Sequence, residues 1–310
     1  MIQNMADRDG WIWLDGSFVP WREAKTHVLT HTLHYGMGVF EGVRAYQTDQ
    51  GTAIFRLDDH TRRLLRSAHI LNMPVPFDKE TLNQAQKHTI AKNNLAHAYI
   101  RPMCFYGSEA MGIRADKLRV HVMIAAWEWP SYMKPEALEQ GIRVRTSSYT
   151  RHHVNITMCK AKANGNYMNS MLALQEAIQS GCEEALLLDN EGYVAEGSGE
   201  NIFLVTGNTL HTPELTSCLA GITRDTIIQF ARDLNVTVQE KRITRDEVYI
   251  ADEAFFTGTA AEVTPIRELD GRKIGQGTRG PVTTKLQAMY FDQVAGRRHG
   301  NYDHWLSYVS

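Results

Sequence analysis

The sequence predicts a mixed α/β (α+β) protein with two domains. At 310 residues the chain is longer than a single compact core usually requires. Apolar runs of strand length alternate with amphipathic helical patterns in both halves. Two prolines and a polar turn interrupt these patterns at 129–135, which favours a connection between domains. We therefore expect a first domain at 1–132, a linker at 133–139 and a second domain at 140–310.

The composition is that of an ordinary soluble globular protein. Hydrophobic residues make up 43% of the chain, charged residues make up 22%, and the formal net charge is −2. Neither a nucleic acid nor a membrane surface is therefore expected as a partner. The N-terminus lacks an apolar segment, and no later run is long enough to span a membrane. The cysteines form no C-x-x-C pair, which indicates reduced thiols in the cytoplasm; they are Cys104, Cys159, Cys182 and Cys218.

The first half combines antiparallel strands with two helices. Arg62, Arg63 and Arg66 lie on the polar side of the first helix, where they are either solvated charges or phosphate ligands. A loop with Met111-Gly112-Ile113 joins two long buried strands. The expected elements are a hairpin at 11–19, paired strands at 43–46 and 53–55, helices at 59–71 and 78–94, and strands at 98–106 and 120–129.

The second half offers two backbone segments suited to an anion. Residues 221–225 open a helix that runs to about 234, with Thr223 at the capping position, and unpaired N–H groups at such a start can bind phosphate. The small residues at 257–262 could also direct N–H groups at an anion. The other expected elements are strands at 142–148, 184–188, 193–195, 201–205, 236–240 and 254–256, and helices at 169–179 and 282–294.

Three histidines have the spacing of metal ligands on a helix. His27, His31 and His34 stand at i, i+4 and i+7, but the same run holds no carboxylate or cysteine that would complete the set. We therefore expect structural histidines and no metal. A non-enzymatic metal-binding or scaffold protein built on this face is the alternative from another functional class.

Two lysines lie in a small, largely apolar stretch at 157–167. Lys160 and Lys162 precede a Gly-Asn-Tyr turn and a helical run. A lysine whose surroundings disfavour its charged form can attack a carbonyl, and enzymes that use pyridoxal 5′-phosphate (PLP) bind their cofactor through such an amine. On a strand the two side chains would share a face, so their spacing alone does not choose between them.

Taken in order, several blocks resemble the fold-type IV PLP-dependent aminotransferases, specifically the branched-chain amino acid aminotransferases. The resemblance implies a small N-terminal α/β domain and a larger C-terminal pseudo-barrel domain, as in D-amino acid aminotransferase. The matching blocks span nearly the whole chain: LHYGMGVFEGVRAY (33–46), HTRRLLRSA (60–68), YIRPMCFYG (99–107), AMGI (110–113), KANGNYMNS (162–170), EGSGENIF (196–203), GITRDTII (221–228) and TGTAAEVTP (257–265).

The resemblance implies a complete cofactor site. The family's lysine lies five residues before the tyrosine of the Gly-Asn-Tyr turn, which selects Lys162 as the catalytic residue and leaves Lys160 as structural. Glu196 would face the pyridine nitrogen and Tyr167 the phenolic oxygen of PLP. The phosphate would be held by Arg63, Ile222, Thr223 and Thr259.

The resemblance also implies the substrates, which are leucine, isoleucine or valine together with 2-oxoglutarate. Tyr99, Ala260 and Ala261 would hold the α-carboxylate, and Arg101 and Tyr35 would accept the distal carboxylate of glutamate. The side-chain pocket would be lined by Phe40, Trp129, Tyr132 and Tyr167, with Met111 and Ile113 reaching in from a neighbouring subunit.

This last contribution implies at least a homodimer, and a hexamer of dimers is the larger alternative. Within the fold the rivals are D-amino acid aminotransferase, (R)-amine transaminase and aminodeoxychorismate lyase. YIRPMCFYG and the AMGI loop favour the branched-chain group over these.

Overall fold

The computed structural model describes residues 4–129 and 135–309 and separates into two compact units. The first unit comprises residues 1–129, 161–165 and 294–310, and the second comprises 130–160 and 166–293. Compared with the boundaries expected from the sequence, two further segments, 161–165 and 294–310, thus join the first unit. Among the described residues no helix is long and apolar enough to cross a membrane.

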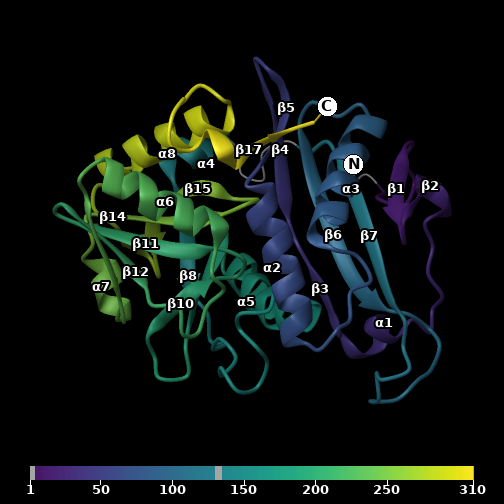
Figure 1. Ribbon diagram of the computed structural model, residues 1–310. Coiled ribbons are helices and arrows are strands. Elements are labelled where there is room, and N and C mark those ends of the chain that lie inside the picture. Colours follow the sequence, from purple (N-terminus) through teal and green to yellow (C-terminus); the bar gives the residue numbers. More distant parts are fainter. Residues whose placement is uncertain (1–3, 130–134, 310) are drawn as a thin grey trace. The chain divides into compact units, whose positions relative to one another are not determined.

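An antiparallel sheet forms the centre of the first unit, in the strand order β17-β5-β4-β6-β7-β1-β2, and β3 pairs with β6 (Figure 1). Its longest strands, β6 (Ala98–Tyr106) and β7 (Val120–Trp127), alternate buried and half-buried residues, because successive side chains of a strand point to opposite faces. The shorter strands are β1 (Trp11–Leu14), β2 (Ser17–Pro20), β3 (Gly38–Phe40), β4 (Val43–Thr48), β5 (Gly51–Phe55) and β17 (Leu306–Tyr308).

Helices α2 (Leu57–Ile70) and α3 (Lys79–Lys92) pack against each other and against this sheet. Leu64 and Ala68 of α2 are fully buried, as the predicted apolar stripe requires, and they join Ile100 and Val122 in the core of the unit. Asp78 caps α3 by accepting a hydrogen bond from the Thr81 amide. The short helix α1 (His31–Tyr35) ends at Gly36, which has a positive φ.

The sheet of the second unit has the order β10-β9-β8-β15-β14-β11-β12-β13, and β16 pairs with β15 (Figure 1). It is mixed, because β8 runs parallel to β9 and β15, and β12 runs parallel to β13. Its strands are β8 (Ile142–Thr146), β9 (Glu184–Leu188), β10 (Val194–Gly197), β11 (Asn201–Thr206), β12 (Thr209–Pro213), β13 (Thr237–Lys241), β14 (Glu253–Gly258), β15 (Glu262–Leu269) and β16 (Arg272–Lys273).

The helices of the second unit cover this sheet, with α5 against β9 and α6 against β13 and β14. Phe230 and Ile227 of α6 are fully buried, which explains the apolar face seen in the sequence. The helices of this unit are α4 (Pro135–Gln140), α5 (Tyr167–Gln179), α6 (Ile222–Asp233), α7 (Arg245–Tyr249) and α8 (Pro281–Val294).

Two local expectations were wrong. Gly221, not Thr223, is the capping residue of α6, and Thr223 is a buried residue of the first turn. A Cβ at Gly221 would lie 1.9 Å from the Asn201 side-chain oxygen, so a larger residue there would require the Asn201 side chain to move. The expected loop at 257–262 is mostly hairpin, because Thr257 and Gly258 belong to β14 and Glu262 begins β15.

Candidate active site

Lys162 belongs to the first unit, where its backbone is fixed on both sides. Its amide donates to the Ser67 hydroxyl at 3.0 Å, and its carbonyl accepts from the Phe40 amide at 3.1 Å. The neighbouring residue Ala163 pairs with Val39 in an isolated bridge. The half-buried side chain places Nζ 5.1 Å from the centroid of the Phe40 ring. The amine is therefore carried by a rigid backbone beside an aromatic wall.

Lys160 has a different setting in the second unit. It lies in an exposed turn, and its Nζ donates to the Cys218 carbonyl at 3.3 Å. The two lysines thus do not extend from one strand, as their spacing in the sequence allowed. Lys160 thus stabilises the segment that precedes α6 through this hydrogen bond.

An aromatic and cationic cluster adjoins Lys162 in the first unit. The guanidinium carbon of Arg101 lies 4.8 Å from the Phe40 ring centroid and 5.5 Å from that of Tyr99. Tyr99 in turn meets Trp129 edge to face at 4.6 Å. A Cβ at Gly42 would lie 2.0 Å from the Tyr99 hydroxyl, so the glycine permits this ring position. Four predicted substrate residues therefore form a chain of contacts that reaches the predicted lysine through Phe40.

Arg63 is held by a buried carboxylate that the sequence reasoning missed. Its Nε donates to Glu41 Oε1 at 2.6 Å and its Nη2 donates to Oε2 at 2.9 Å, a bidentate pair that fixes the guanidinium plane. His60 Nδ1 lies 2.7 Å from the same Oε2. Glu41 is 0% exposed and His60 is 2% exposed. Arg63 is thus positioned by the protein itself.

The charge state of this trio follows from burial and pairing. Burial opposes ionisation of Glu41, but Arg63 and then His60 outweigh it and lower the pKa of the carboxyl to about 2. Burial lowers the pKa of His60, so its imidazole is neutral at pH 7. Glu41 and Arg63 therefore form the ion pair, and His60 donates a hydrogen bond to the carboxylate from Nδ1.

In the second unit Glu196 lies on β10, whose residues are all buried. Its Oε1 is 2.8 Å from Arg151 Nε, and its Oε2 accepts from the Leu219 amide at 3.2 Å. The side chains of Arg151 and Glu196 are 8% and 7% exposed. Oε2 thus accepts a hydrogen bond, whereas the contact between Oε1 and Arg151 is an ion pair without hydrogen-bond geometry.

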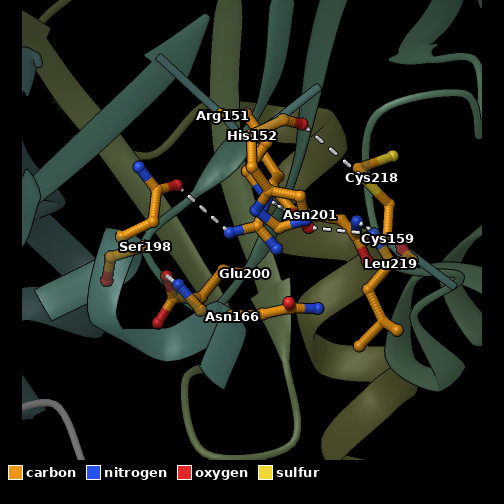
Figure 2. A network of polar contacts seen from close by, with 12 residues as sticks. Arg151, His152, Cys159, Asn166, Ser198, Glu200, Asn201, Cys218 and Leu219 are labelled. Atoms are coloured by element: carbon orange, nitrogen blue, oxygen red, sulfur yellow. Dashed lines mark hydrogen bonds and ion pairs between the residues drawn. The ribbon is translucent and has the colours of Figure 1, made fainter. Parts of the chain in front are cut away.

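Polar contacts link several loops of the second unit, among them those that carry Arg151, Asn201 and Leu219 (Figure 2). The Asn201 amide group donates to the Leu219 carbonyl at 3.0 Å, which ties the segment before α6 to β11. An added Cβ at Gly258 would meet the Gly199 carbonyl and the Glu200 side chain, so the turn after β14 also approaches this region. Glu196, the start of α6 and the end of β14 are therefore neighbours within the second unit.

The remaining predicted residues lie on turns and element ends. Tyr167 is the first residue of α5, and Thr259, Ala260 and Ala261 form the turn between β14 and β15. Tyr35 ends α1 and is 48% exposed, while Met111 and Ile113 are 47% and 93% exposed on the loop between β6 and β7. Tyr132 lies outside the described residues.

The three histidines each contact a backbone group. His31 is buried with Nε2 2.7 Å from the Gly112 carbonyl oxygen, and His34 Nε2 is 2.9 Å from that of Val28. His27 precedes α1 and accepts from the Leu29 amide. No group of metal-ligating side chains occurs in 4–129 or 135–309. The structure thus gives each histidine a backbone contact, and their structural role stays a prediction.

The sequence and the fold of this chain match the class IV aminotransferases in comparisons with a family model, known sequences and solved structures. The model for "Amino-transferase class IV" matches residues 38–269. A branched-chain-amino-acid aminotransferase of Pseudomonas aeruginosa is 66% identical over 306 residues, covering 99% of each chain. A "T.th." branched-chain amino acid aminotransferase with pyridoxamine 5′-phosphate superposes with a TM-score of 0.95 at 50% identity, covering 98% of this chain and 99% of that one. Its complex with N-(5′-phosphopyridoxyl)-L-glutamate gives a TM-score of 0.94 at 49% identity, with the same coverage. The resemblance and the fold class predicted from the sequence are confirmed.

The Glu41–Arg63 pair yields a stability prediction. Glu41→Gln leaves the Arg63 charge without its buried partner, so the free energy of unfolding in urea should fall by about 3–5 kcal/mol at pH 7. Asp58→Asn is the control, since Asp58 pairs with Arg62 and Lys79 at the surface, where all three side chains are nearly half exposed. That change should cost at most about 1 kcal/mol. Equal losses in the two variants would contradict the account.

The pH dependence has a definite sign. Because the pKa of Glu41 is lowered from 4.5 to about 2 on folding, its contribution is complete above pH 4.5 and is lost as the pH falls towards 2. The stability difference between the wild type and Glu41→Gln should therefore shrink over that range.

Proposed function

Because the chain belongs to the class IV aminotransferases, we propose that it transfers the amino group of leucine, isoleucine or valine to 2-oxoglutarate, with PLP as cofactor, yielding the branched-chain 2-oxo acids and L-glutamate. The observation that carries this proposal is the 66% identity to a branched-chain enzyme over nearly the whole length of both chains. The pyridoxamine 5′-phosphate and phosphopyridoxyl-glutamate in similar structures support the same cofactor and amino acceptor.

The residues of each unit fit PLP. The N-cap of α6, Gly221, makes no side-chain capping bond, which suits the start of that helix to a phosphate. Glu196 is an oriented, buried carboxylate of the kind that can accept a hydrogen bond from a ring N–H. In the first unit, Lys162 supplies an amine on a fixed backbone, and Arg63 supplies a preset guanidinium.

In the bound enzyme PLP would supply an electron sink for the negative charge that develops at the substrate α-carbon. Lys162 would hold the cofactor and afterwards carry the proton that leaves that carbon. Glu196 would keep a proton at the pyridine nitrogen, and Tyr167 would donate a hydrogen bond to the phenolic oxygen. Arg63, Thr259 and the backbone of Ile222 and Thr223 would bind the phosphate and fix the orientation of the ring.

The substrate side must accept both an aliphatic side chain and a carboxylate. Tyr99 and the amides of Ala260 and Ala261 would hold the α-carboxylate. Arg101 suits a pocket that accepts both kinds of side chain, because its guanidinium lies over the Phe40 and Tyr99 rings. An aliphatic substrate would therefore contact aromatic surface and not an isolated cation. Its Nε has no hydrogen-bond partner among the described residues, which suits a site awaiting the distal carboxylate of glutamate, together with Tyr35. The pocket walls would be Phe40, Trp129, Tyr132 and Tyr167.

A homodimer would complete this pocket, with Met111 and Ile113 of the partner subunit at its edge. Both units expose large apolar side chains that a monomer would leave in water. In the first unit these include Val28, Leu33 and Ile113, and in the second Ile156, Met168 and Met171. We place the enzyme in the cytoplasm, since its four cysteines are unpaired thiols, as a reducing compartment would keep them.

Substitution of each lysine tests the cofactor assignment. Lys162→Ala should lose the borohydride-sensitive visible absorption of the purified enzyme and its activity, because no amine remains to hold the cofactor. Lys160→Ala is the matched control and should keep both. Loss of the absorption in Lys160→Ala alone would overturn the choice of Lys162.

An amino-donor panel tests the substrate class. L-Leucine, L-isoleucine and L-valine with 2-oxoglutarate should each yield L-glutamate, and D-alanine should yield none. Glutamate formed only from the D-amino acid would refute the branched-chain assignment in favour of a D-amino acid aminotransferase.

Sedimentation equilibrium of the purified enzyme tests the assembly. We expect a mass of at least twice the 35.1 kDa of the chain, because the exposed apolar side chains would be covered. Replacing Ile113 by aspartate should weaken association. A wild-type monomer with full activity would contradict the shared pocket.

A further inference from the structure

Arg151 is the buried cation next to Glu196, and its anchors come from several parts of the second unit. Its amide donates to the Leu188 carbonyl at the end of β9, at 2.7 Å. Its Nε lies 2.8 Å from Glu196 Oε1 on β10, and its Nη1 donates to the Asn169 side-chain oxygen on α5, at 3.4 Å. One side chain thus spans β10 and the helix that begins at Tyr167.

Two further basic residues near this pair, His152 and Lys160, differ from Arg151 in charge or in contact. Burial, and then the Arg151 charge, lower the pKa of the adjacent His152 to about 4, so that imidazole is neutral at pH 7. Lys160 donates to the Cys218 carbonyl, one residue before the Leu219 amide that meets Glu196 Oε2. Lys160 therefore acts on the backbone segment, while Arg151 acts on the carboxylate itself.

A guanidinium in this position has two physical effects on Glu196. It cannot lose its proton, so it favours the ionised carboxylate at every working pH. It also attracts Oε1 across 2.8 Å as an ion pair, while the Leu219 amide donates a hydrogen bond to Oε2, so the two oxygens are held from different sides. A carboxylate offers about four acceptor sites, so these contacts are compatible with a further donor.

We propose that Arg151 is a positioning residue that keeps Glu196 ionised and directs it at the pyridine nitrogen of PLP. The proposal rests on the proposed function, since it concerns the group that Glu196 would contact. It assigns to Arg151 a role in turnover, exerted through Glu196 and not through substrate contact.

A double-mutant cycle on the holoenzyme tests this coupling. Arg151→Met removes the charge at similar side-chain length, and the single-turnover rate with L-leucine should fall about 10- to 100-fold, the usual loss when the support of a functional ligand is removed. KM should change much less than kcat. In the Glu196→Gln background the same substitution should cost under about 2-fold, because the group through which it acts is gone. Equal losses in both backgrounds would overturn the proposal.

Two further variants separate positioning from folding. Arg151→Lys keeps the charge but not the planar fork, and should recover part of the rate. Arg145→Met removes an exposed arginine of β8 that bonds Ser180, and should leave the rate unchanged. If Arg151→Met does not fold, the rates of Arg151→Lys and of the double variant Arg151→Met/Glu196→Gln are compared with those of the wild type and Glu196→Gln instead. A rate in Arg151→Lys equal to that of the wild type, or no recovery despite a wild-type melting temperature, would contradict the proposal.

Spectroscopy supplies a measure independent of turnover. With PLP labelled with ¹⁵N in the ring, the pyridine resonance should move in Arg151→Met and stay near its wild-type position in Arg145→Met. An unmoved resonance in Arg151→Met would refute the proposal. A wild-type protein that binds no PLP would refute the proposed function instead, so the two failures are distinguishable.

Discussion

Each unit is built around a buried carboxylate that is matched by an arginine. Glu41 with Arg63 in the first unit and Glu196 with Arg151 in the second are ion pairs from which water is almost excluded. A buried charge without a partner costs several kcal/mol, so the surrounding backbone must hold both members in register. The strands, helix ends and glycines nearby meet that demand, and as a result the predicted functional side chains have fixed orientations.

The two ion pairs differ in which residue, the arginine or the carboxylate, is the predicted ligand. In the first unit the carboxylate is fully enclosed and the arginine is the predicted ligand, so Glu41 would orient the proposed donor for an anion. In the second unit the carboxylate is the predicted ligand, and the arginine forms an ion pair with it. In the proposed roles, the same physical interaction would thus prepare one unit for a phosphate and the other for a ring nitrogen.

Much of the fold was predictable, because the spacing of apolar residues along the chain indicates many of the helices and strands. The apolar stripe of α2 and the long buried strands β6 and β7 were expected close to their observed bounds. β15 was not, since Pro265 and a preceding run of small residues resemble a loop. The cap of α6 was misassigned because Asn201, whose side chain lies close to Gly221, is distant in sequence.

The candidate site depended on resemblance more than on pattern. Lys162 was chosen over Lys160 by its distance from Tyr167, and the roles of the site residues remain predictions. Glu41 and Arg151 were missed because a single glutamate in a glycine-rich segment and a single arginine after a strand have no periodic signal. Only their burial against opposite charges identifies them.

The passage of residues 161–165 through the first unit has a consequence for biosynthesis. The chain leaves that unit after 129, returns at 161, leaves again after 165 and returns at 294 to add β17 beside β5. Neither unit is a continuous segment, so neither unit can be fully synthesised before synthesis of the other has begun. The edge strand β17 follows the whole second unit in sequence, so the first sheet is completed only after the second unit has been synthesised, and a chain cut before β17 would leave β5 as an open sheet edge.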